Sequence, residues 1–193
     1  MKGMAMPGAM VADGENEVRW TRDGFWTIVE AGLLEDVRKA ELIDGRIEGE
    51  MPQGTDHWLV YRALQKAFAG IVLDGVWATN SPPLDVTPFN VFEPEIVVMK
   101  DTPGIPKATD VSLVIEVSDS SLRKDLGPKK RAYAIAGVAA YWVFDVNARA
   151  LRTFEEPSDE EYVLTSQYGA GDRVSVPGLG IELDVASVFA EID

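Results

Sequence analysis

The chain has 193 residues, with 18 lysines and arginines against 32 aspartates and glutamates, so its formal net charge is −14. This length fits one domain, and a hydrophobic fraction of 46% is sufficient for a core. The absence of cysteine excludes disulfides, thiolate zinc sites, iron–sulfur clusters and cysteine nucleophiles. A single histidine, His57, excludes multi-histidine metal sites. Any chemistry must therefore depend on carboxylates, lysine, tyrosine, serine or threonine.

The net charge and the hydropathy pattern limit the expected partners and the expected cellular location of the protein. A net negative charge opposes bulk attraction to nucleic acid, because phosphate binding depends on lysine and arginine. No run approaches the roughly 18 uninterrupted apolar residues of a membrane helix, and the N-terminus lacks the apolar core of a signal peptide. We therefore expect a cytoplasmic protein without a membrane segment. Residues 1–19, rich in Met, Gly and Ala, predict a flexible leader, and 20–193 a single domain.

Hydrophobic periodicity and turn residues predict the elements up to residue 146. Thr21 is suited to cap a helix that ends near Gly32, and Asp44-Gly45 is a strong two-residue hairpin signal. The expected elements, in chain order, are a helix over 21–32, a hairpin over 41–51, an amphipathic helix over 56–69, strands over 76–80 and 84–87, buried strands over 94–100 and 111–117, a helix over 125–136, and a buried strand over 139–146.

The strand, helix and strand over 111–146 suit a crossover between parallel strands. The remainder of the chain predicts a C-terminal β-meander over 151–154, 162–167, 174–176 and 181–183, interrupted by an acidic turn at 155–161. The sequence therefore predicts one α/β or α+β domain without repeats.

Two carboxylates and a lysine stand out by their positions. Glu95 begins one buried strand and Glu116 lies near the end of the next, although ionised carboxylates are costly in apolar segments unless they are paired or bind metal. Lys129 lies in the first turn of the following helix, where the helix dipole does not favour a cation. A crossover helix returns across the sheet, so the three groups can converge.

Such a trio suits metal-assisted hydrolysis of a phosphodiester. Hard oxygen ligands select Mg²⁺ or Mn²⁺, a bound metal lowers the pKa of water, and the lysine orients the nucleophile and counters phosphate charge. The alternative is that Glu95 and Glu116 only cap strand ends and pair with basic residues, because buried ion pairs need no catalytic role. The spacing alone leaves both interpretations open.

Several segments resemble a known family: ELIDG (41–45), the lone His57 opening a helix, PEIVVMK (94–100) and, most specifically, LVIEVSDSSLRKDLGPKKRAYAIAGVAAYWVFDV (113–146). Over roughly residues 21–190 the chain resembles the Uma-type restriction-endonuclease-like proteins of the PD-(D/E)XK nuclease superfamily. The resemblance implies a mixed central sheet with flanking helices, a Mg²⁺- or Mn²⁺-dependent endonuclease activity, and nucleic acid as partner, DNA rather than RNA, with a homodimer as one option.

The resemblance also implies roles for individual residues. Glu95 matches the metal-binding aspartate of the family's Pro-Asp pair, and Glu116 matches the second acidic ligand, with the carbonyl of Val117 as a further metal ligand. Lys129 matches a catalytic lysine carried on the next helix, and Glu41 an acidic position that holds metal-bound water. One departure is that glutamate replaces aspartate at 95, which moves the carboxylate by about one C–C bond and disturbs a metal site positioned to ~0.5 Å. Ser118 occupies the superfamily's commoner lysine position.

Other candidate residues have two interpretations each. Five basic residues fall within 123–131, and Arg123, Lys124, Lys130 and Arg131 either bind phosphates or form a solvated helix rim. His57 is either an accessory group of the site or a surface or capping residue. A serine nucleophile lacks the G-x-S-x-G elbow.

Two alternatives to the nuclease stay open. The first is a nuclease fold that has weakened or lost its activity and acts as a binding or regulatory module. The second is a different hydrolase that depends on His57.

Overall fold

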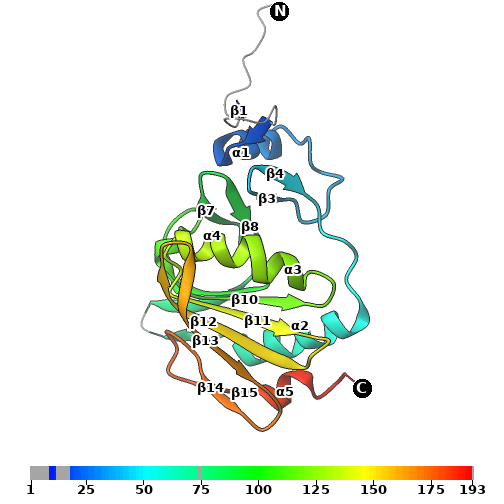
Figure 1. The fold of residues 1–193 in the computed structure, drawn as a ribbon, viewed down its shortest axis with the longest axis vertical. Helices are drawn as coiled ribbons and strands as arrows, with labels where there is room; N and C mark the ends of the chain where they lie inside the picture. Colours follow the sequence, from blue (N-terminus) through cyan, green and yellow to red (C-terminus); the bar gives the residue numbers. More distant parts are fainter. Residues whose placement is uncertain (1–8, 12–17, 74, 193) are drawn as a thin grey trace, which may run out of the picture.

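The computed structural model describes the chain except residues 1–8, 12–17, 74 and 193 (Figure 1). The leader expected over 1–19 lies largely outside the described residues. Within it, β1 (Ala9–Val11) pairs antiparallel with β2 (Val18–Trp20). The division into a leader and one domain over 20–193 stays a prediction. No helix among the described residues is long and apolar enough to cross a membrane.

The described residues form a seven-stranded mixed sheet in the order β13-β12-β11-β10-β9-β6-β5. β10 and β11 run parallel, whereas the other neighbours in this sheet are antiparallel. The crossover expected over 111–146 is therefore confirmed. The strands of the seven-stranded sheet are β5 (Val72–Leu73), β6 (Val76–Asn80), β9 (Ile96–Lys100), β10 (Val111–Ser118), β11 (Ala140–Asp145), β12 (Ala150–Ser158) and β13 (Glu161–Tyr168). A 3₁₀ turn, η1 (Ala108–Asp110), precedes β10.

The crossover is one helical path with a π segment inside it. It consists of α3 (Leu122–Lys124), the π-helical η2 (Asp125–Lys129) and α4 (Lys130–Ile135), so it begins three residues before the expected Asp125. Pro128 has no N–H to donate to the carbonyl four residues earlier. Two residues further on, the N–H of Lys130 donates to the carbonyl of Asp125, which is the five-residue spacing of a π-helix.

The two faces of the sheet are covered by different helices (Figure 1). Side chains alternate along β10: Leu113 and Ile115 pack in one core cluster with α2 (Thr55–Phe68) and α5 (Val185–Phe189). Val114 packs in the opposite cluster, with Tyr133 of α4. Because both faces of β10 are covered, its sequence is a nearly continuous run of apolar residues and does not alternate with polar ones.

A second sheet and the first helix lie at the end of the molecule opposite β14 and β15 (Figure 1). The order is β4-β3-β8-β7. Its hairpin turns at Asp44-Gly45, both with positive φ (47° and 80°), as the sequence predicts. β8 was not expected, because its three residues follow directly on a Pro- and Phe-containing turn. The elements are α1 (Arg22–Glu30), β3 (Glu41–Ile43), β4 (Arg46–Glu48), β7 (Leu84–Thr87) and β8 (Asn90–Phe92).

The C-terminal part confirms the meander in β12 and β13 and departs from the expected acidic turn. The ladder continues to Ser158↔Glu161, so the chain reverses at Asp159, whose φ is 54°. Tyr162 is buried and donates to the carbonyl of Val138, which holds this extension in place. β14 (Arg173–Ser175) and β15 (Glu182–Asp184) pair in a separate sheet.

A pair of matched truncations tests how the core depends on burial. Leu113 is fully buried in β10, whereas Leu164 of β13 is 49% exposed. We expect Leu113→Ala to lower the free energy of unfolding by about 3 kcal/mol, because it removes transfer energy and leaves a cavity. Leu164→Ala should cost less than about 1 kcal/mol. Urea unfolding followed by circular dichroism measures both, and equal losses would contradict the core assignment.

Candidate active site

Two buried carboxylates meet where β9 and β10 stop pairing. The antiparallel ladder between these strands ends at Ile96↔Ile115. Glu95 directly precedes β9 and Glu116 follows Ile115, so the start of one strand lies beside the end of the other. Their exposed fractions are 4% and 2%. The structure therefore brings together the two acids that the sequence singled out.

Glu95 is held through both of its carboxylate oxygens. Oε2 accepts a hydrogen bond from the backbone N–H of Val117 at 3.1 Å, and Oε1 accepts one from Lys39 Nζ at 3.0 Å. Because the N–H and C=O of a strand residue point to the same edge, the Val117 carbonyl also faces this side. Burial alone would raise the pKa of Glu95, but the charge of Lys39, a hydrogen bond with Glu116 and the charge of Lys129 lower it to about 2.

Glu116 faces the crossover helix, as expected for the same face of β10 as Val114. Its Oε1 accepts hydrogen bonds from Lys129 Nζ at 2.9 Å and from the Tyr133 hydroxyl at 3.2 Å. Burial and the neighbouring charge of Glu95 hold the pKa of Glu116 well above its usual value, although Lys129 acts in the opposite direction. The pKa values of these two neighbouring carboxyl groups are thus shifted in opposite directions.

Lys129 connects Glu116 to the second sheet. Its ammonium lies 2.8 Å from Glu41 Oε1, and that oxygen also accepts the backbone N–H of Glu93 at 2.9 Å. Burial would lower the pKa of Lys129, but the charges of Glu116 and Glu41 raise it well above its ordinary value. Lys129 therefore stays an ammonium ion between the side chains of Glu116 and Glu41.

Asp125 fixes the helix that carries Lys129. Its Oδ2 accepts hydrogen bonds from the hydroxyls of Ser118 and Ser121, both at 2.6 Å, and its backbone carbonyl accepts one from Tyr141 at 3.1 Å. Ser118 is fully buried and is directed at Asp125. Its observed contact thus anchors the crossover to the end of β10.

His57 is buried rather than a surface residue. It lies in the first turn of α2, with Nε2 3.9 Å from Glu95 Oε1 and an exposed fraction of 4%. Its buried Nδ1 has no hydrogen-bond partner among the described residues. His57 is therefore placed beside Glu95, where it can contact a ligand of that carboxylate.

The basic residues of 123–131 are for the most part paired with acids. Lys124 lies 3.9 Å from Glu41 and 3.8 Å from Glu48. Lys130 pairs with Glu161 at 2.9 Å, and Arg131 bonds both oxygens of Glu160, at 2.6 and 2.9 Å. Arg123 is exposed and lines the same cleft as Glu95 and Glu116. The structure thus brings Arg123 and Lys124 to the site, and Lys130 and Arg131 to the β12–β13 hairpin.

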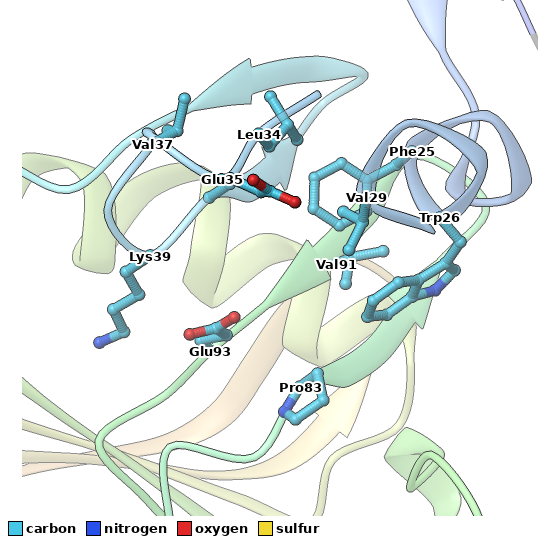
Figure 2. Close-up of a pocket in the computed structure, with 11 residues that line it drawn as sticks. Phe25, Trp26, Val29, Leu34, Glu35, Val37, Lys39, Pro83, Val91 and Glu93 are labelled. Atoms are coloured by element: carbon cyan, nitrogen blue, oxygen red, sulfur yellow. The ribbon is translucent and has the colours of Figure 1, made fainter. Parts of the chain in front are cut away.

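The site opens into a cleft of about 1090 Å³. Its lining includes Glu41, His57, Glu95, Glu116, Val117 and Lys129, together with Lys39, Glu50 and Gln53, which the sequence did not single out. Lys39 also lines a neighbouring pocket of about 260 Å³ beside α1, with the aromatic rings of Phe25 and Trp26 on one side and Lys39 and Glu93 on the other (Figure 2). No periodicity surrounds Lys39, so its place could not be read from the pattern.

The oxygen donors of Glu95, Glu116 and the Val117 carbonyl suit a small hard cation. Among the described residues, no cluster of three acidic or imidazole side chains is arranged to hold a metal. Mg²⁺, however, keeps several waters and is commonly bound through one or two carboxylates. Glu95, Glu116 and the Val117 carbonyl supply such a donor set on the cleft wall. The residues present therefore fit Mg²⁺ or Mn²⁺.

The mixed sheet, the paired carboxyl groups of Glu95 and Glu116, and Lys129 on the crossover helix together define a restriction-endonuclease-like nuclease fold. The model of the Uma2 family, described as "Putative restriction endonuclease", matches residues 30–186, and the chain belongs to this family.

A crystal structure described as "a putative nuclease belonging to DUF820", from Anabaena variabilis, matches with a TM-score of 0.62 and 16% identity over 78% of this chain and 89% of that chain. At this identity it shows the fold alone. A search of curated proteins gave no match.

The opposite pKa shifts of Glu95 and Glu116 predict opposite effects of pH on the free energy of unfolding. The pKa of Glu116 is raised in the folded state, so stability falls as pH rises above its unfolded value near 4.5, by at most about 1.4 kcal/mol per unit. Glu116→Gln should therefore gain stability relative to the parent between pH 5 and 8. Glu95, whose pKa is about 2, stabilises above pH 4.5, and Glu95→Gln should lose stability there.

Urea unfolding in metal-free buffer at pH 5 and 8 measures both effects. Parallel pH profiles for the parent and Glu116→Gln would contradict the raised pKa.

Proposed function

We propose that the chain is a metal-dependent endonuclease that hydrolyses phosphodiester bonds of DNA. The observation that carries the proposal is the meeting of Glu95, Glu116 and Lys129 in one cleft. Membership of the Uma2 family supports the reaction class. The likeness to the Anabaena protein supports the fold in which this chemistry is placed.

In this proposal each residue has a separate task. Glu95, Glu116 and the Val117 carbonyl hold Mg²⁺ or Mn²⁺. When bound, the cation lowers the pKa of water and polarises a phosphoryl oxygen. Lys129 orients the attacking water and offsets the charge that develops on the phosphate, because its ammonium is fixed between two carboxylates. Glu41 holds Lys129 and can bind water at the mouth of the site.

The partners and the assembly are part of the same proposal. Arg123 and Lys124 lie on the cleft and are placed to contact phosphates of the substrate. A homodimer would present two sites to the two strands, and the edge strand β13, which exposes Val163 and Leu164, offers a surface for it. The location in the cytoplasm stays a prediction from composition.

One observation favours a second candidate, a nuclease fold that binds nucleic acid without cutting it. The positions next to both carboxylates are already occupied by ammonium groups, Lys39 at Glu95 and Lys129 at Glu116. A cation must enter beside these two ammonium charges. Calorimetric titration separates the candidates, because the binding module takes up neither Mg²⁺ nor Mn²⁺.

Cleavage assays test the nuclease proposal directly. We expect the parent to cut plasmid and single-stranded DNA with Mg²⁺ or Mn²⁺, and Glu116→Gln and Lys129→Met to lose at least about a hundredfold in rate, which is the usual effect of removing one charged group from a transition-state contact. Lys66→Met, on the exposed side of α2, is the control. Variants that cut as fast as the parent would refute the assignment, and loss only in His57→Ala would favour a different hydrolase.

The ion pairs of the basic segment predict unequal effects on binding. Arg123→Ala should weaken binding and reduce the slope of log affinity against log salt by about one, as expected for one lost phosphate contact. Glu160→Gln with Glu161→Gln should strengthen binding, because Arg131 and Lys130 lose their acidic partners. Fluorescence anisotropy with labelled DNA at several salt concentrations measures both. Weaker binding by the double variant would contradict a phosphate-binding role for Lys130 and Arg131.

A further inference from the structure

Lys39 has a backbone conformation that lysine seldom adopts. Its φ is +46°, in the left-handed region that favours glycine and asparagine. Six described residues other than glycine have positive φ, and among them only Lys39 lines the cleft. Strained residues of this kind persist where the surrounding structure holds them, and they concentrate at functional sites. The strain at Lys39 therefore indicates that its side chain has a role in the cleft.

The neighbouring segments hold the Lys39 backbone in place. The N–H of Glu50 donates to the carbonyl of Arg38 at 2.9 Å, which ties the residue before Lys39 to the chain beyond β4. On the other side, β3 begins at Glu41 and pairs with β4 and β8. Lys39 thus spans two fixed points, and its side chain leaves in a defined direction, away from the rings of Phe25 and Trp26 (Figure 2).

The ammonium of Lys39 ends on Glu95. It lies 3.0 Å from Glu95 Oε1 and 3.5 Å from Glu50 Oε1, and Gln53 in turn donates to Glu50 at 2.8 Å. Glu95 Oε2 is held by the Val117 N–H, so each oxygen of the carboxylate has its own donor. A glutamate side chain has three rotatable bonds, and with one contact alone the carboxylate could still turn about the oxygen that is held.

We propose that Lys39 is the positioning residue of Glu95, whose ammonium keeps this carboxylate in one orientation toward the Val117 and Glu116 side of the cleft. The inference rests on the proposed function only where it concerns the metal: a correctly oriented Glu95 is a better ligand for Mg²⁺ or Mn²⁺. Lys129 does not replace Lys39, because its contacts within salt-bridge distance are Glu41 and Glu116.

Lys39→Gly and Lys39→Asn test the role without disturbing the backbone, because both residues accept positive φ. We expect each to weaken Mn²⁺ binding about tenfold or more, the usual effect of removing a group that orients a metal ligand. Added n-butylammonium, which replaces the missing side chain, should raise the Lys39→Gly affinity toward that of the parent and leave Lys39→Asn unchanged. Asp159→Gly, which relieves positive φ in a remote turn, should bind as the parent does.

Calorimetric titration of the full chain with Mn²⁺ measures these affinities. Parent-like affinity in Lys39→Gly, or no response to n-butylammonium, would overturn the proposal.

A second measurement needs neither metal nor activity. In metal-free buffer, Lys39→Asn and Glu95→Gln should each destabilise the chain, and the double variant should lose far less than the sum, with a coupling of about tenfold in the unfolding constant. Additive losses would overturn the role of Lys39. If the parent binds no Mn²⁺ while the coupling is present, the proposed nuclease function fails and the positioning of Glu95 by Lys39 stands.

Discussion

The arrangement of the site depends on one electrostatic constraint, the burial of two carboxyl groups at the end of an apolar strand pair. Glu95 and Glu116 lie side by side and are buried, so water does not solvate them. An uncompensated pair of this kind would be very costly. Two ammonium groups offset the cost, and each comes from a different part of the chain. Lys39 precedes the second sheet, and Lys129 belongs to the crossover helix.

This constraint links the two sheets. Lys129 reaches from the crossover to Glu41 at the start of β3, and Lys39 reaches from the segment before β3 to Glu95 at the start of β9. The first contact joins the crossover helix to the small sheet, and the second joins the segment before the small sheet to the start of β9. The side chains of both ion pairs line the cleft, and apolar clusters cover the two faces of the large sheet.

The sequence predicts the site in part, and the limit has a physical reason. Glu95, Glu116 and Lys129 could be found because each breaks a local rule: an acid in an apolar strand, or a cation in the first turn of a helix. Lys39 breaks no rule that a pattern reveals, since a lysine in a polar segment is ordinary. The pairing of Arg131 with Glu160 also escaped prediction, because the acidic segment extends the β12–β13 ladder instead of forming a loop.

The π segment of the crossover has a consequence for motion. Pro128 removes one backbone hydrogen bond from the turn that carries Lys129, while the strands on either side keep their full ladders. Local opening is easiest where backbone bonds are few. Amide protons around 125–130 should therefore exchange with solvent well before those of β10 and β11. In such an opening Lys129 leaves Glu41 and Glu116 while the sheet stays folded, so the ammonium group of the site is carried by a turn that lacks one backbone hydrogen bond.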